Sequence, residues 1–140
     1  MLQSPWLLET ARVDRAPRAR ALAEGRLVEV TPVARQAGFQ VPVALTAAVW
    51  VASVAWPWEN WTQEARVRLW ELLCAAGWAW RRHGPLPLVS FGLYQVPSGG
   101  GAPIWRPLGL RLGVGDGAEP VITIHQLGEA LSHESANQLA

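Results

Sequence analysis

Residues 88–124 read LVSFGLYQVPSGGGAPIWRPLGLRLGVGDGAEPVITI, and this stretch decides the fold class. Apolar residues alternate with other residues along 88–96 and along 108–114, and β-branched residues dominate 121–125. A period of two is typical of strands that bury one face. The glycine- and proline-rich tract 97–103 and a later Gly-Asp-Gly sequence would form the two turns. The stretch therefore predicts an antiparallel meander of three strands.

The longest helix is predicted immediately before this meander, over residues 63–82. Four of its residues recur at helical spacing and would face the sheet: Ala65, Leu69, Leu72 and Ala76. Gly77 costs about 1 kcal/mol relative to alanine inside a helix, which predicts that another element packs closely there. The expected fold is α+β, with N-terminal helices packed on an antiparallel sheet and residues 27–30 as a further candidate strand.

Helix-start signals mark the N-terminal half of the chain. A serine or threonine that can cap the first turn predicts four starts: Ser4, Thr31, Thr46 and Thr62. Residues 16–24 form another candidate helix, which Gly25 would end. The uncharged helix expected after Thr46 spans about ten residues, whereas a bilayer core requires about 20. We therefore expect a buried core helix and no membrane segment.

Length and composition favour one domain without a cofactor. The 140 residues are expected to form a single domain over 1–127, followed by a polar, flexible tail over 128–140. The single cysteine excludes a disulfide framework, and the three histidines match no metal-ligand spacing, so no metal is expected. The glycine-rich residues 113–117 precede a strand, which favours a turn over a phosphate-binding loop. Without a secretory signal at the N-terminus, the expected location is the cytoplasm.

Tryptophan is the most unusual component of the chain, with nine residues. Trp56, Trp58 and Trp61 crowd into one proline-containing loop between two predicted helices. Such a cluster can be the lid of a core, or it can be an exposed patch that binds another protein or stacks on bases. Because loops carry many binding residues, we expect this cluster to be an interaction site.

A catalytic site is harder to find. His125 is the best candidate general acid or base, because Glu119, Arg111 and Tyr94 could lie on neighbouring strands. Small antiparallel-sheet ribonucleases use similar sets of side chains, although this is an analogy at the level of the fold. The ordinary alternative is a histidine at the end of a strand with no role in catalysis.

Basic residues give a weak indication of nucleic-acid binding. All twelve are arginine, and the net charge is only +1, so no global attraction to nucleic acid is expected. Four arginines near the N-terminus could form a stripe that contacts phosphates: Arg12, Arg15, Arg18 and Arg20. A solvated helix face is the alternative interpretation of the same residues.

Several strings resemble an uncharacterised family of short proteins carried on plasmids and integrative mobile elements. They are residues 25–31, 34–46, 48–50, 68–70, 91–96 and 115–124. The chain departs from that family where Val51, Ala52 and Ser53 follow Trp50 in place of an acidic residue and a cysteine. It departs again where His125 and Gln126 replace an apolar residue and an acidic ending. The resemblance implies an accessory protein of a mobile element and carries over no catalytic residue.

These observations predict a non-enzymatic protein-interaction module that binds a host or element-encoded protein through Trp56, Trp58 and Trp61. A small nuclease or nucleic-acid-binding protein that uses the sheet face around Tyr94, Arg111 and His125 is the alternative. A homodimer joined by the apolar end of the long helix is a third expectation.

Overall fold

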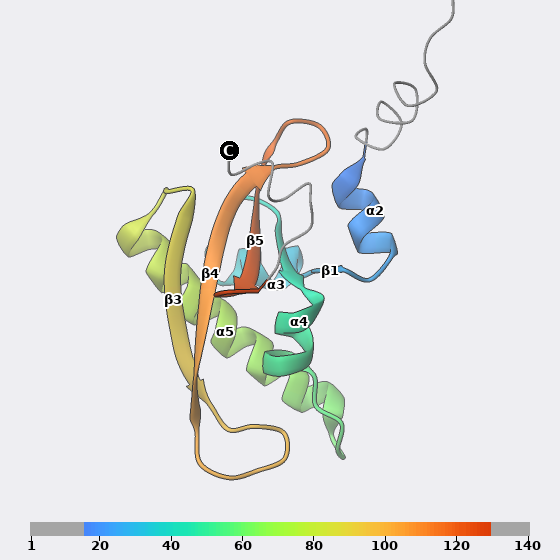
Figure 1. Ribbon diagram of the computed structural model, residues 1–140, viewed down its shortest axis with the longest axis vertical. Helices are drawn as coiled ribbons and strands as arrows, with labels where there is room; N and C mark the ends of the chain where they lie inside the picture. The colour runs from blue at the N-terminus through green and yellow to red at the C-terminus, as the bar shows by residue number, and fades with distance from the viewer. Residues whose placement is uncertain (1–15, 130–140) are drawn as a thin grey trace, which may run out of the picture.

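The computed structural model describes residues 16–129, which form helices around one five-stranded sheet (Figure 1). The strands are β1 (Leu27–Glu29), β2 (Val43–Thr46), β3 (Leu88–Gln95), β4 (Ile104–Val114) and β5 (Pro120–Gln126). The helices are α2 (Pro17–Ala23), α3 (Thr31–Gln36), α4 (Ala47–Val49), the π-helix η1 (Trp50–Val54) and α5 (Trp61–His83). The strand order is β1-β2-β5-β4-β3, and the α+β class predicted from the sequence is confirmed.

The predicted meander is present as β3, β4 and β5, which pair antiparallel in sequence order. Strand β4 begins at Ile104, four residues before its predicted start, because the ladder with β3 extends to the pair Gln95–Ile104. Pro107 lies inside this strand but does not break it. Its carbonyl still accepts a hydrogen bond from the Leu127 N–H at 3.2 Å, and only the missing N–H is lost from the ladder.

Strand β2 was missed, and with it the mixed character of the sheet. β2 runs parallel to β5 and antiparallel to β1, so the prediction of a purely antiparallel sheet was wrong. All four residues of β2 are buried. A strand that is buried on both faces shows no alternation, and a short apolar run cannot be distinguished from a buried helix by its period.

Helices begin within one or two residues of the predicted starts at Thr31, Thr46 and Thr62, but only one of the three predicted side-chain caps is present. The Thr46 hydroxyl accepts a hydrogen bond from the Val49 N–H at 3.2 Å and caps α4, as expected. Helix α3 has no side-chain cap, because the Thr31 hydroxyl instead bonds Glu29 and the backbone of Val43. Helix α5 begins one residue before Thr62, after a residue in the left-handed region. Ser4 lies outside the described residues.

Helix α5 packs on β3 and carries much of the core. The four residues predicted to face the sheet are all buried: Ala65, Leu69, Leu72 and Ala76. A Cβ atom at Gly77 would lie 3.1 Å from the carbonyl oxygen of Ala37, so the predicted close approach at this glycine is confirmed. No helix within residues 16–129 combines the length and the apolar composition that a bilayer span requires.

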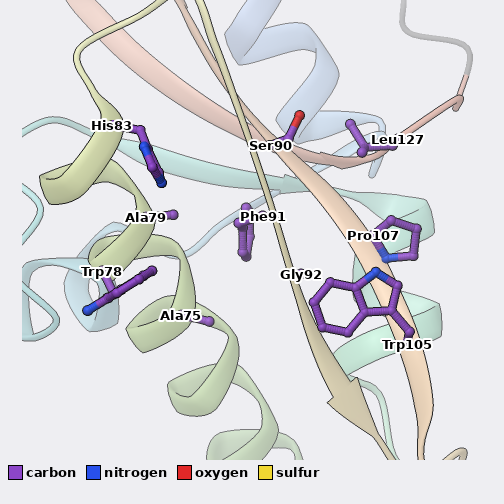
Figure 2. A pocket seen from close by; sticks show the side chains of 10 residues that line it. All are labelled: Ala75, Trp78, Ala79, His83, Ser90, Phe91, Gly92, Trp105, Pro107 and Leu127. Carbon is purple, nitrogen blue, oxygen red and sulfur yellow. The ribbon is translucent and has the colours of Figure 1, made fainter.

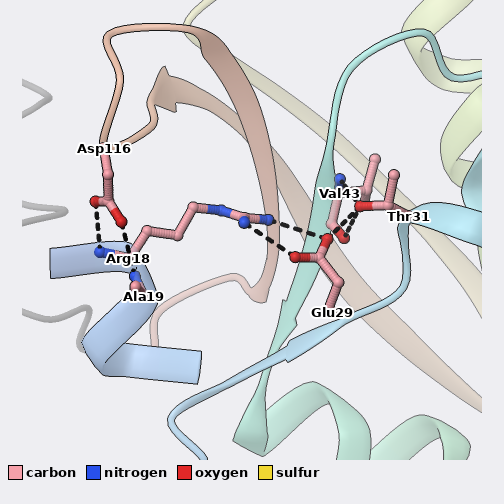
Figure 3. A network of polar contacts seen from close by, with 6 residues as sticks. All are labelled: Arg18, Ala19, Glu29, Thr31, Val43 and Asp116. Carbon is pink, nitrogen blue, oxygen red and sulfur yellow. Dashed lines mark hydrogen bonds and ion pairs between the residues drawn. The ribbon is translucent and has the colours of Figure 1, made fainter. Parts of the chain in front are cut away.

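A polar network fastens α2 to the β1 side of the sheet (Figure 3). The Asp116 carboxylate, from the turn between β4 and β5, accepts hydrogen bonds from the backbone N–H groups of Arg18 and Ala19, both at 2.9 Å. The Arg18 guanidinium donates two hydrogen bonds to Glu29, at 3.0 and 3.2 Å. The Thr31 hydroxyl also donates to Glu29. Helix α2 thus receives an N-terminal cap from a residue 98 positions away in the sequence.

The folded part of the chain continues beyond residue 127. The Glu129 carboxylate accepts hydrogen bonds from the Thr46 hydroxyl at 3.0 Å and from the Gln126 N–H at 2.8 Å. The first two residues of the predicted flexible tail therefore belong to the domain, and residues 130–140 lie outside the described part.

Candidate protein-interaction surface

The loop between η1 and α5 holds Trp56 and Trp58, and Trp61 is the first residue of α5. Trp58 is 58% exposed and Trp61 is 63% exposed, whereas Trp56 is half-buried. Tryptophan is highly buried on average in folded proteins, so two exposed rings only three positions apart are unusual. This is the arrangement that the interaction hypothesis requires of Trp58 and Trp61.

Trp56 anchors the loop to α5 through a contact with Arg68. Its ring faces the guanidinium of Arg68, whose carbon lies 5.3 Å from the ring centroid. Arg68 is 8% exposed, and it donates a hydrogen bond to the carbonyl of Val96 at 3.0 Å. Burial lowers the pKa of Arg68 below its ordinary value, and the charge of Arg106 lowers it further.

A second anchor joins the loop to the β3–β4 hairpin. The indole N–H of Trp58 donates a hydrogen bond to the carbonyl of Ser98 at 2.6 Å. Together with the contact between Trp56 and Arg68, this bond holds the loop at two points. A loop that is already held in place loses less conformational entropy when a partner binds.

An apolar cleft of about 310 Å³ lies between η1, the loop and the start of α5. We name it the tryptophan cleft, and its lining residues are Trp50, Val51, Ala55, Trp56, Pro57, Trp61, Ala65 and Ser98. None of these side chains is charged. A cleft of this kind fits an apolar side chain of a partner protein.

Val51 is the functional candidate that sequence reasoning missed. It is 71% exposed at the mouth of the tryptophan cleft, although it lies in an apolar run that was predicted to be a core helix. The π-helical turn allows Val49 and Val54, five residues apart, to be buried together. No local sequence signal distinguishes this turn from an α-helix, so the exposure of Val51 could not be anticipated.

Further exposed tryptophans lie outside the loop. Trp70 and Trp78 on α5 are 42% and 58% exposed, and Trp105 on β4 is 51% exposed. Trp6 lies outside the described residues. Exposed tryptophans are therefore not confined to the predicted cluster, and they also lie on α5 and β4.

The predicted catalytic residues do not converge. His125 and Arg111 are neighbours, because His125 pairs with Gly109 and Arg111 with Thr123 on adjacent strands. Tyr94 pairs with Trp105, four positions along β4 from Gly109, which corresponds to roughly 13 Å at about 3.3 Å per residue. Glu119 lies in the β4–β5 turn, where its carboxylate accepts a hydrogen bond from the Gly117 N–H at 2.9 Å.

His125 itself is buried. It is 3% exposed, and its ring lies over Gly109, where a Cβ atom would come within 2.7 Å of the ring. Nδ1 lies 2.9 Å from the carbonyl oxygen of Gln126, while Nε2 is buried without a partner. Burial lowers the pKa of His125, and the nearby charge of Arg111 lowers it further. A neutral, buried imidazole is expected near neutral pH.

The predicted arginine stripe is only partly described. The Arg18 guanidinium is engaged with Glu29, so it is turned toward the sheet rather than toward a ligand. Arg20 is half-buried in α2, and Arg12 and Arg15 lie outside the described residues.

No group of three or more histidine, cysteine, aspartate or glutamate side chains within residues 16–129 is placed to hold a metal ion. Comparisons of the chain with protein-family models, with curated proteins and with solved structures find no match. The geometry of the tryptophan cleft is therefore the main basis for a functional conclusion.

Proposed function

We propose that this protein is a non-enzymatic interaction module of a mobile genetic element that binds another protein through the tryptophan cleft. The observation that carries the proposal is the exposure of Trp58 and Trp61 beside an uncharged cleft of about 310 Å³. Binding energy at protein interfaces is concentrated in a few residues, and tryptophan is enriched among them. The mobile-element setting rests on the family resemblance of the sequence.

The chemistry of the cleft defines the partner. Its lining offers aromatic and aliphatic surface and no charge, so the partner must insert an apolar side chain. Two contacts already hold the loop in place: Arg68 packs on the Trp56 ring, and the Ser98 carbonyl accepts a hydrogen bond from Trp58. These contacts reduce the conformational change that binding would require. The partner is a host or element-encoded protein.

The test is capture from a nuclease-treated host lysate with matched tryptophan variants. Trp61→Ala removes a ring from the cleft, whereas Trp70→Ala removes an exposed ring of the same helix that does not line it. We expect the captured protein to bind Trp61→Ala at least about 30-fold more weakly, which corresponds to a hot-spot loss of about 2 kcal/mol. It should bind Trp70→Ala unchanged. Equal capture by both variants would contradict the proposal.

A nuclease or nucleic-acid-binding activity is the second candidate, and one observation favours it. Arg111 lies next to His125, whose Nε2 has no partner among the described residues. The candidate stands second because His125 is 3% exposed and because Tyr94 and Glu119 lie apart from it. Under this hypothesis His125→Gln abolishes cleavage of an RNA substrate and leaves protein capture intact. Unchanged cleavage would exclude a catalytic role for His125.

A further inference from the structure

Strand β3 forms one edge of the sheet, and it lacks the features that usually protect an edge. It is eight residues long and reads LVSFGLYQ, with no charged residue and no proline. Natural sheets block exposed edges with short strands, charges, proline or a covering element. A long, uncharged edge is a template for pairing with another strand.

The backbone groups that face this edge can be identified from the ladder with β4. The Leu112 N–H donates to the Pro87 carbonyl at 3.0 Å, which identifies this pair as a hydrogen-bonded one. Bonded and non-bonded pairs alternate along an antiparallel ladder. The N–H and C=O groups that point away from β4 therefore belong to Leu88, Ser90, Gly92 and Tyr94. Within residues 16–129, no strand pairs with them.

Aromatic side chains stand on both sides of this free edge (Figure 2). Trp78 of α5 lies on one side of β3, and Trp105 of β4 lies on the other; they are 58% and 51% exposed. The indole of Trp105 reaches across Gly92, where a Cβ atom would overlap it. An apolar cavity of about 570 Å³ runs from α5 past β3 to Trp105 and Pro107. A strand added to this edge would lie between the two tryptophans.

We propose that the occupant is β3 of a second copy of this chain, paired antiparallel about a two-fold axis at Phe91. In this register Leu88 lies opposite Tyr94 of the partner subunit, and Ser90 lies opposite Gly92 of the partner subunit. Large side chains meet large ones and small meet small on this face of the sheet. All four outward-facing residues of each strand find hydrogen-bond partners, because even-numbered residues pair only with each other.

The character of the edge favours a second copy over an unrelated strand. An uncharged apolar edge selects an uncharged apolar strand, and β3 itself meets that requirement. Phe91 would contact Phe91 of the partner subunit on the α5 side of the joined sheet. Because α5 packs on β3, the two copies of α5 would lie side by side and cover Trp78. Trp61 is 17 positions from Trp78, about 25 Å at about 1.5 Å per residue, so the tryptophan cleft remains free.

The first test is the mass of the full chain in solution, measured by light scattering over a wide concentration range. We expect twice the 15.3 kDa of one chain for the native sequence and a single chain for Ser90→Lys, which places a charge at the edge. Ala23→Lys is the matched control, because Ala23 is an exposed residue of α2, which lies on the opposite side of the molecule from β3 (Figure 1). It should remain dimeric. A monomeric native chain, or a Ser90→Lys variant that stays dimeric, would overturn the proposal.

Amide hydrogen exchange tests the register within one strand. The amides of Val89, Phe91 and Leu93 bond β4 and should exchange slowly in both the native chain and Ser90→Lys, which also verifies that the variant folds. The amides at positions 90 and 92 should exchange slowly in the dimer of the native chain and rapidly in the Ser90→Lys variant. Fast exchange of these two amides in a dimer would place the interface elsewhere. Slow exchange in a monomer would mean that another segment of the chain covers the edge, and either result contradicts the proposal.

Discussion

The two edges of the sheet are built in opposite ways. Strand β1 has three residues, ends in the charged Glu29 and lies beside α2, to which the Arg18 ion pair ties it. Strand β3 has eight uncharged residues, and no described helix or loop pairs with its outer backbone. Figure 1 shows α2 on one side of the molecule and β3 on the other. A short strand, charge and a covering helix are known protections against edge-to-edge pairing.

This difference indicates where association can occur. The β1 edge is covered by α2, which is held there by residues of three segments: Arg18 of α2, Glu29 of β1 and Asp116 of the β4–β5 turn. The β3 edge has no comparable closure among residues 16–129 and is flanked by exposed tryptophans. Because β3 is the one unprotected edge among the described strands, the proposed pairing would produce a closed dimer rather than an open chain of subunits.

The largest loss of stability is expected from adding a methyl group at Gly92, where the Trp105 indole already lies against the β3 backbone. Gly92→Ala would place a Cβ against the Trp105 indole and 2.8 Å from the carbonyl oxygen of Arg106. Overpacking of this kind costs about 1–3 kcal/mol, which urea unfolding can measure. Gly99→Ala is the control, since a Cβ there meets nothing within 4 Å. Equal unfolding midpoints for the two variants would show that Trp105 does not hold its place over β3.

An intermediate effect is expected from removing the cap of α2 on the β1 side. Asp116→Ala removes the acceptor for the Arg18 and Ala19 N–H groups and should reduce the free energy of unfolding by about 1 kcal/mol. The amides of Arg18 and Ala19 should exchange faster in this variant, while that of Phe91 stays unchanged. Asp116→Asn keeps a side-chain acceptor and should retain most of the stability. If Asp116→Ala left both amides as slow as before, the proposed closure of this edge would be wrong.

The smallest effect is expected from the partly exposed ion pair of β1. Burial raises the pKa of Glu29, but hydrogen bonds from Arg18 and Thr31 outweigh it and leave the pKa below its ordinary value of 4.5. Because its pKa is lowered in the folded state, Glu29 contributes stability above pH 4.5 that is lost as the pH falls below that value. Glu29→Gln should cost about 0.2–1 kcal/mol at neutral pH and remove this part of the pH dependence.

The control for Glu29 is Glu24, which forms an exposed ion pair with Arg26. Glu24→Gln should change the free energy of unfolding less than Glu29→Gln, because Glu24 bonds neither another element nor the Thr31 hydroxyl. Chemical denaturation measures the free energy of unfolding of both variants at several pH values. A range of about pH 3 to 7 is chosen because it spans the ordinary pKa of a carboxyl group. An identical pH dependence of the native chain and Glu29→Gln would contradict the role assigned to this network.

The sequence by itself determined the features that depend on local periodicity. The alternation along 88–96 and 108–114 determined the meander, and the helical spacing of Ala65, Leu69 and Leu72 determined which face of α5 is buried. Both follow from the direction in which successive side chains point along one element. The cluster of Trp56, Trp58 and Trp61 could also be identified as a candidate site from the sequence, because it lies in a proline-containing segment between two predicted helices.

Only the tertiary structure decided what depends on distant neighbours. Whether residues 43–46 form a strand depends on β5, nearly eighty positions later, because a doubly buried run has no period of its own. The exposure of Val51 depends on a π-helical turn against the core, and the separation of Glu119 and Tyr94 from His125 depends on the register of three strands. Which strand is left at the edge is likewise a property of the whole sheet, because an edge exists only where no other segment pairs.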